Sequence, residues 1–136
     1  MDYDSWEAGV PKRIKAEPIW NFLGYRKALY LYNLIWEETE NWSNIPQGWP
    51  LTRQITGSCG SISANLEEGL GRGYGKELLY HYRVALASAR ETKGWLYRAH
   101  HIIAPDKLEP LLSLTDEVIA LIIHELSYQR IRTSNR

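Results

Sequence analysis

The chain has 136 residues and a mass of 15.8 kDa, the size of a single domain. Its hydrophobic content of 44% is enough for a core, and its single cysteine, Cys59, excludes an intrachain disulfide. The 16 basic and 16 acidic residues cancel, whereas a nucleic-acid-binding domain usually carries a basic excess. Residues 1–10 lack the pattern of a signal peptide and the longest apolar run, 118–123, is too short to span a bilayer, so we expect a cytoplasmic protein with no membrane contact.

Residues 1–22 are predicted to form an N-terminal arm. They contain Pro11 and Pro18 and show no sustained helical period. The arm also contains Trp6 and Trp20, and disordered segments are poor in aromatic residues. We therefore expect the arm to be ordered by contact with another surface.

The first long helix is predicted over residues 23–42. Its core stripe follows the helical period and consists of Ala28, Leu31, Ile35 and Trp42. A second stripe of Leu29, Tyr32 and Trp36 lies on a different face of the same helix. Because one helix in one bundle needs only one apolar stripe, the second predicts an oligomer interface.

The second long helix is predicted over residues 51–68, after a loop at 43–50 that holds two prolines and a glycine. Its apolar stripe is Leu51, Ile55, Cys59, Ile62 and Leu66. It is rich in glycine and serine, although each glycine costs about 1 kcal/mol of helix propensity relative to alanine. Such small residues indicate that another backbone approaches closely. The glycine-rich segment 69–75 closes this helix, whereas a dinucleotide-binding loop opens one, so helix termination is the favoured interpretation.

Two further helices are predicted over residues 76–103 and from 106 onward. Pro105 separates them, and Asp106 with Glu109 is a candidate capping pair. Short links favour antiparallel neighbours. The sequence therefore predicts an all-α protein, an antiparallel up-and-down four-helix bundle over residues 23–127, followed by a basic C-terminal tail at 128–136.

Three cations recur every seven residues on the third helix. Lys76, Arg83 and Arg90 share one side and stand about 10 Å apart at the helical rise per residue. Such a ladder can follow a nucleic-acid backbone. Alternatively, it can pair with the acidic last helix of a neighbouring subunit, through Asp116, Glu117 or Glu125. With the tail, the candidate nucleic-acid-binding residues are Lys76, Arg83, Arg90, Arg130 and Arg132, and Arg136 adds one more arginine.

The centre of the chain carries a specific motif. It reads LTRQI at 51–55, S at 58, SISANLEEGLGR at 61–72 and ALASARE at 85–91. This resembles the four-helix-bundle family named for the 23S rRNA intervening sequence, whose pattern is close to L-T-x-Q-hydrophobic, S-I-x-x-N-hydrophobic-x-E-G-x-G-R and A-x-x-S-x-x-E. The resemblance covers roughly residues 23–126 and includes YRKA at 25–28. Two features depart from the family: Glu67 stands where alanine is usual, and the arm of 22 residues is long.

The resemblance implies a homopentameric ring of bundles. It also implies kinship with accessory proteins of diversity-generating retroelements, which share the fold and bind a reverse transcriptase and its RNA. The predicted function is a non-enzymatic, homo-oligomeric accessory protein that binds structured RNA or a nucleoprotein such as a reverse transcriptase complex. The alternatives are a protein–protein scaffold that does not touch nucleic acid, and a bundle that binds a metal or small molecule.

The motif residues have a structural interpretation. They are Arg53, Ser58, Asn65, Glu68, Gly69, Gly71, Arg72, Ser88 and Glu91. If the second and third helices are antiparallel about the turn at 72–75, Ser58 lies level with Ser88, which lets the helices approach closely. Arg53 then lies near the level of Glu91 and can pair with it. The alternative is a recognition site formed by Asn65, Glu68 and Arg72.

The sequence holds no recognisable catalytic set. Its histidines are His81, His100, His101 and His124. A di-iron bundle needs glutamate and histidine three residues apart on paired helices, and the nearest case, Glu77 with His81, is four apart and single. One cysteine cannot supply a zinc site, and Cys59 on an apolar stripe is expected to be inert. We therefore expect no enzymatic activity, no metal and no cofactor.

Overall fold

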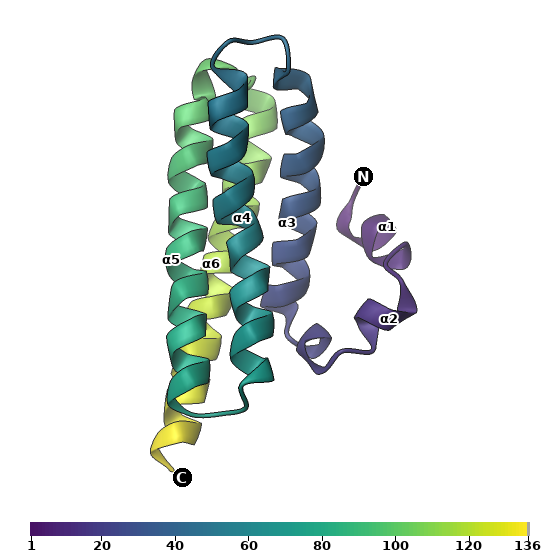
Figure 1. The fold of residues 1–136 in the computed structure, drawn as a ribbon. Coiled ribbons are helices and arrows are strands. Elements are labelled where there is room, and N and C mark those ends of the chain that lie inside the picture. The colour runs from purple at the N-terminus through teal and green to yellow at the C-terminus, as the bar shows by residue number, and fades with distance from the viewer. Residues whose placement is uncertain (136) are drawn as a thin grey trace.

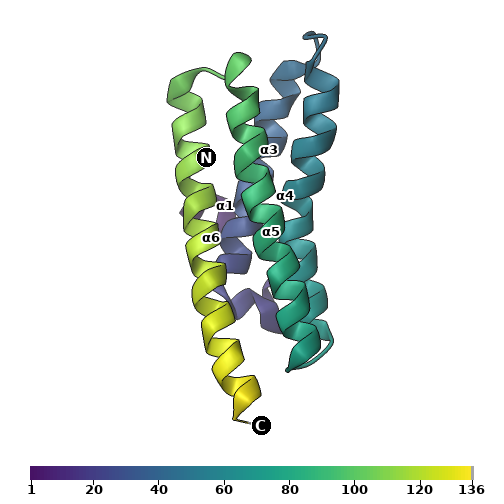
Figure 2. The ribbon, with the colours of Figure 1, turned by 90° about the vertical axis from the view of Figure 1, so that its left-hand side faces the viewer.

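The long helices α3, α4, α5 and α6 lie side by side in the protein (Figures 1 and 2). The structure is a computed structural model that describes residues 1–135. In chain order its elements are α1 (Tyr3–Ala8), α2 (Lys12–Lys15), the 3-10 turn η1 (Pro18–Asn21), α3 (Leu23–Thr39), η2 (Glu40–Trp42), α4 (Gly48–Gly71), α5 (Lys76–Arg98), η3 (Ala99–His101) and α6 (Pro105–Ser134). Each long helix packs against two others, in the pairs α3–α4, α4–α5, α5–α6 and α3–α6. The predicted all-α class is confirmed, since residues 1–135 contain no strand.

The core lies between the four long helices, and on α3 and α4 it contains the predicted apolar stripes except Leu51, which is half-buried. Side chains with almost no exposed area include Leu31, Ile35, Trp42, Ile55, Ile62, Leu66, Leu96, Val118 and Ile122. Positions three or four apart on a helix share one face, so a single stripe per helix closes this core. Over the described part of the chain, no helix has both the length and the apolar character needed to cross a membrane.

The second long helix is longer than predicted at both ends. α4 begins at Gly48 because Pro50 falls in the first turn, where its missing N–H has no intrahelical partner to lose. It continues through Gly71, and Arg72 is its C-cap. Gly73, with φ of 92°, then takes the left-handed conformation and its N–H donates to the Leu70 carbonyl. Termination by a left-handed glycine is therefore confirmed.

The ends of the last two helices, α5 and α6, also differ from the predicted ends. α5 stops at Arg98, and a 3-10 turn leads out of it. The predicted capping pair of Asp106 and Glu109 is wrong, because the N-cap is Ala104 and no side chain caps the helix. Pro105 occupies the first helical position instead, where its fixed φ favours helix initiation. α6 continues to Ser134 and Asn135 is its C-cap, so the predicted basic tail is helical through Ser134, and Arg136 lies outside the described residues.

The N-terminal arm is ordered and docks on α3 (Figure 1). The Trp6 ring stacks 6.3 Å from Trp20 and lies 5.5 Å from Tyr30 of α3, measured between ring centroids. Glu7 forms an ion pair of 3.2 Å with Arg26. Ile19, at the end of the arm, is buried in the core. The two tryptophans that predicted an ordered arm thus make its contacts.

Deleting residues 1–20 is expected to lower the free energy of unfolding. The deletion uncovers the core beneath Ile19, and burial of one such side chain contributes about 2 kcal/mol. Urea denaturation followed by circular dichroism measures the change. The variant Asp4→Asn, an exposed side chain of the arm, is the control and should change stability very little. Equal stability of the truncated and full chains would mean that the arm does not stabilise the bundle.

Candidate functional site

A row of hydrogen-bonded polar side chains runs along the contact between α4 and α5. From the turn outward, the pairs are Asn65 with His81 (3.3 Å), Ser61 with Ser88 (2.9 Å) and Ser58 with Thr92 (3.0 Å). The predicted pairing of Ser58 with Ser88 is therefore wrong by about one helical turn. Only positions three or four apart on each helix face the partner helix, so the next such position takes the contact. The small hydroxyl side chains still allow the close approach that was predicted.

Arg53 does not join this row. Arg53 and Glu91 are both exposed, and among residues 1–135 no ion pair connects them. At 3.6 residues per turn, Arg53 lies about 140° around α4 from Ser58 and so faces away from the row. Glu91 instead accepts a hydrogen bond of 2.9 Å from the Trp95 indole. The predicted Arg53–Glu91 pair is wrong.

The other motif residues gather at the end of α4. Arg72 pairs with Glu68 at 2.9 Å and with Glu77 at 3.8 Å, and His81 lies 4.0 Å from Glu68. The two exposed ion pairs of Arg72 contribute at most about 1 kcal/mol each. Glu68 and Arg72 therefore have charged partners within the chain, which favours the structural interpretation of the motif.

The two motif glycines differ in what surrounds them. A Cβ added to Gly69 would lie 3.0 Å from the Tyr82 ring, so this glycine permits the close packing of α4 on α5. A Cβ added to Gly71 would meet no atom within 4 Å, so packing within the chain does not require glycine there.

Cys59 is buried on the inner face of α4. Burial raises the pKa of its thiol to about 12, so the thiolate is absent near neutral pH. We expect no reaction with Ellman's reagent in the folded protein at about pH 8.5, and rapid reaction once denaturant unfolds it. The raised pKa also predicts that stability falls as pH rises above the ordinary thiol pKa, because only the unfolded state then loses the proton. Rapid labelling without denaturant would show that the thiol is accessible.

The predicted cationic ladder is exposed along α5, which lies at the front in Figure 2. Within residues 1–135, no acid forms an ion pair with Lys76, Arg83 or Arg90. Two tyrosines share this face at helical spacing: Tyr80 is 62% exposed and Tyr97 is 64% exposed. We call these five residues the α5 stripe. Tyr97 continues the seven-residue period of the cations, and Tyr80 lies between Lys76 and Arg83 on the same side of the helix; neither tyrosine was predicted as part of the site.

The acidic residues proposed as alternative partners for the ladder have contacts within their own chain. Those contacts are Lys93 with Asp116 at 2.7 Å, Lys27 with Glu117 at 3.1 Å, and Gln129 with Glu125 at 2.8 Å. These carboxylates are thus already engaged, which weakens the case for an intersubunit pairing with the ladder.

The C-terminal arginines lie at the end of the bundle where α5 begins. The Arg132 guanidinium lies 4.3 Å from the ring centroid of Tyr74, which precedes Lys76 by two residues. Arg130 is exposed and donates a long hydrogen bond of 3.5 Å to Ser127. The structure therefore brings Arg132 beside the start of the α5 stripe.

The predicted oligomer face of α3 is partly exposed. Leu29 and Tyr32 are half-buried, whereas Trp36 is 54% exposed. Trp36 also lines a hollow of about 580 Å³ together with Trp49 of α4, which is 68% exposed. Two exposed indoles on neighbouring helices form an apolar face larger than the sequence indicated.

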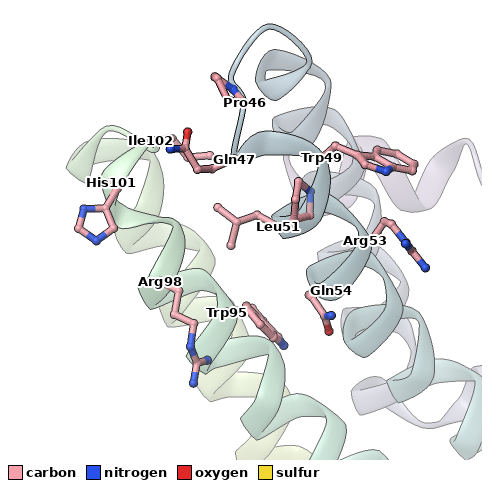
Figure 3. A pocket seen from close by; sticks show the side chains of 11 residues that line it. Pro46, Gln47, Trp49, Leu51, Arg53, Gln54, Trp95, Arg98, His101 and Ile102 are labelled. Carbon is pink, nitrogen blue, oxygen red and sulfur yellow. The ribbon is translucent and has the colours of Figure 1, made fainter.

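A larger groove of about 1040 Å³ opens where α4 begins and α5 ends (Figure 3). It is lined by Pro46, Gln47, Trp49, Pro50, Leu51, Arg53, Gln54, Trp95, Arg98, His101 and Ile102. These residues come from two segments far apart in the sequence, 46–54 and 95–102, so no local pattern predicts the groove. Within the described part of the chain, no three acidic, histidine or cysteine side chains gather to hold a metal.

Comparison with known proteins identifies the family. The sequence model described as 23S rRNA-intervening sequence protein matches residues 21–124. No curated protein matches the chain. Among solved structures, a crystal structure of a protein with unknown function from the S23 ribosomal protein family of Bacteroides thetaiotaomicron is similar, with a TM-score of 0.72 and 22% identity over 77% of this chain and 96% of that chain. This structural likeness supports the fold alone, but the family match spans most of the sequence, and the chain therefore belongs to the 23S rRNA-intervening sequence protein family.

Proposed function

We propose that the protein is a non-enzymatic, homo-oligomeric accessory protein that binds structured RNA, alone or in a nucleoprotein such as a reverse transcriptase complex. The observation that carries this proposal is the α5 stripe. Its three cations are exposed and form no ion pair within residues 1–135, and successive cations stand about 10 Å apart. Cations of this kind bind phosphates and release counterions, while exposed tyrosines offer flat surfaces to unpaired bases.

The proposal includes an antiparallel up-and-down four-helix bundle that assembles into a ring, most simply a pentamer. The reversal of chain direction at each link between the long helices in Figure 1 supports the bundle topology. The exposed indoles of Trp36 and Trp49 support assembly. A ring repeats the α5 stripe around its circumference, so that weak single contacts add through multivalency.

A net charge of zero is compatible with this role. Glu117 of α6 pairs with Lys27 of α3, and Asp116 of α6 pairs with Lys93 of α5, so neither acid neutralises a cation of the α5 stripe. The alternative function is a protein–protein scaffold that does not contact nucleic acid. The exposed α3–α4 aromatic face is the observation that favours this alternative.

The test replaces Lys76, Arg83 and Arg90 by glutamine. Wild-type binding to a structured RNA is expected to weaken roughly 40-fold between about 50 and about 200 mM salt if one stripe makes three phosphate contacts. The triple variant should lose most of this affinity and most of its salt dependence. The matched control changes Lys12, Arg13 and Lys15 of α2 to glutamine, which removes equal charge from the arm on the far side of α3 (Figure 1).

Three results count against the proposal. Absence of wild-type binding to RNA and duplex DNA at low salt favours the scaffold. An equal loss in the α2 control means that only total charge matters. Dissociation of the oligomer by the triple change, measured by light scattering, assigns the ladder to an intersubunit contact.

A further inference from the structure

The groove between the start of α4 and the end of α5 is lined by aromatic and cationic side chains. Figure 3 shows Leu51 and Trp95 between the two helices and Arg98 and His101 on the α5 side, whereas Trp49 and Arg53 extend from the side of α4 that is turned away from α5. No carboxylate occurs among its eleven lining residues. Its volume of about 1040 Å³ is at the upper end of ordinary ligand pockets. A groove with aromatic walls and cationic rims suits a flat, anionic occupant.

The orientation of the Trp95 ring is fixed by a hydrogen bond and by packing against the core. Its indole N–H donates to Glu91 at 2.9 Å, and one face of the side chain packs against the core. Glu91 lies outside the lining, and this bond engages one of its oxygens. The Arg98 guanidinium lies 4.7 Å from the Trp95 ring centroid. Arg98 is itself exposed, so it can turn toward a phosphate or stack on a base from the opposite side.

The groove lies beyond the end of the α5 stripe. Arg98 of the groove follows Arg90 by eight residues, which at helical geometry places it about 12 Å farther along α5 and about 80° around the helix. A strand whose phosphates follow Lys76, Arg83 and Arg90 therefore reaches the groove by turning around the end of α5. The aromatic and cationic lining without carboxylates favours a nucleotide, which has a flat base and an anionic phosphate, over an acidic peptide, which offers no base to stack on the indole.

We propose that this groove binds an unpaired nucleotide of RNA, with the base on the Trp95 indole and the phosphate on Arg98 or Arg53. The inference deepens the proposed function and rests on it: the α5 stripe holds the RNA backbone and the groove selects a single-stranded segment beside it.

The test compares a short RNA duplex, the same duplex with a single-stranded oligoadenylate overhang, and the free oligoadenylate, each labelled for fluorescence anisotropy. In the wild type, the overhang is expected to tighten binding about tenfold over the duplex, the effect of stacking one base. The groove variant Arg53→Gln with Arg98→Gln should lose this gain and bind the duplex as the wild type does. Both side chains are exposed, so the variant should fold. Trp95→Leu removes the stacking surface, and its folding is checked by circular dichroism.

The outcomes separate the two proposals. If the duplex binds but the overhang adds nothing, or if the groove variant keeps the full gain, the groove proposal is wrong and the α5 stripe stands. If oligoadenylate binds through the groove while the duplex does not bind, the groove stands and the stripe is wrong. If no RNA binds at low salt, both are wrong. An equal gain from a DNA overhang supports nucleotide binding in the groove and overturns its preference for RNA, and tighter binding of an acidic peptide than of oligoadenylate overturns the proposal.

Discussion

Replacing Gly48 by alanine is expected to lower the free energy of unfolding by about 3 kcal/mol, a large effect for one added methyl group. A Cβ at this position would lie 2.1 Å from the Trp42 carbonyl oxygen and 3.0 Å from the Trp42 carbonyl carbon. The obstacle is backbone, which cannot rotate away as a flexible side chain does. Trp42 is itself only 1% exposed, so its shift would disturb the core. Urea denaturation measures the loss.

The matched control is Gly71→Ala at the other end of the same helix. An added Cβ there meets no atom within 4 Å, so the gain in helix propensity, up to about 1 kcal/mol, should raise stability. The two substitutions are chemically identical and their predicted effects have opposite signs. Similar effects of the two variants would mean that the contact between Gly48 and Trp42 does not govern the start of α4.

The sequence predicted the helices through their periodicity but not all of their ends. The stripe of Ala28, Leu31 and Ile35 repeats every three or four residues, and all three side chains are buried. The start of α4 depends instead on the approach of Gly48 to Trp42, a contact across a turn that no periodic pattern contains. The register between α4 and α5 was missed by one turn for a related reason. Counting from the turn gives the level of a residue and leaves its direction around the helix open.

The candidate site was predictable only where it lies on one helix. The cations of the α5 stripe were found because Lys76, Arg83 and Arg90 share a simple spacing. The groove combines Trp49 with Trp95 and His101, residues that become neighbours only when the ends of α4 and α5 meet (Figure 3). Arg53 was assigned to a structural pair for the same reason, and the structure places it on the wall of that groove.

The two departures from the family pattern occur in one place. Glu67, found where the family usually has alanine, accepts a hydrogen bond of 2.6 Å from Tyr25. Burial raises the pKa of the Tyr25 hydroxyl, which keeps it protonated as a donor. Glu67 and Tyr25 line a hollow together with Ile14 and Ile19 of the arm. The long arm and the unusual glutamate therefore belong to one local arrangement that covers this side of α4.

The second large effect is expected in the mass of the assembled protein in solution, when Trp36 is replaced by glutamate. Light scattering of the wild type should give several times 15.8 kDa, and five times that value for a pentamer. Trp36→Glu should shift the protein toward the monomer because it places a charge in an apolar contact without a partner. Helix content should remain nearly unchanged, since Trp36 is 54% exposed in the single chain and does not support its core.

Ile131→Glu on α6 is the control, because Ile131 is also exposed, at 62%, and lies outside the α3–α4 face. It should leave the mass unchanged. Gly57 gives an independent test of the same face. Its Cβ position is open within the chain, so a bulky Gly57→Leu change can disturb only an approaching neighbour, and it should weaken the oligomer if α4 lies in the interface. A wild type that is monomeric at micromolar concentration would contradict the ring, and the exposed indoles of Trp36 and Trp49 would then be the surface for a different protein.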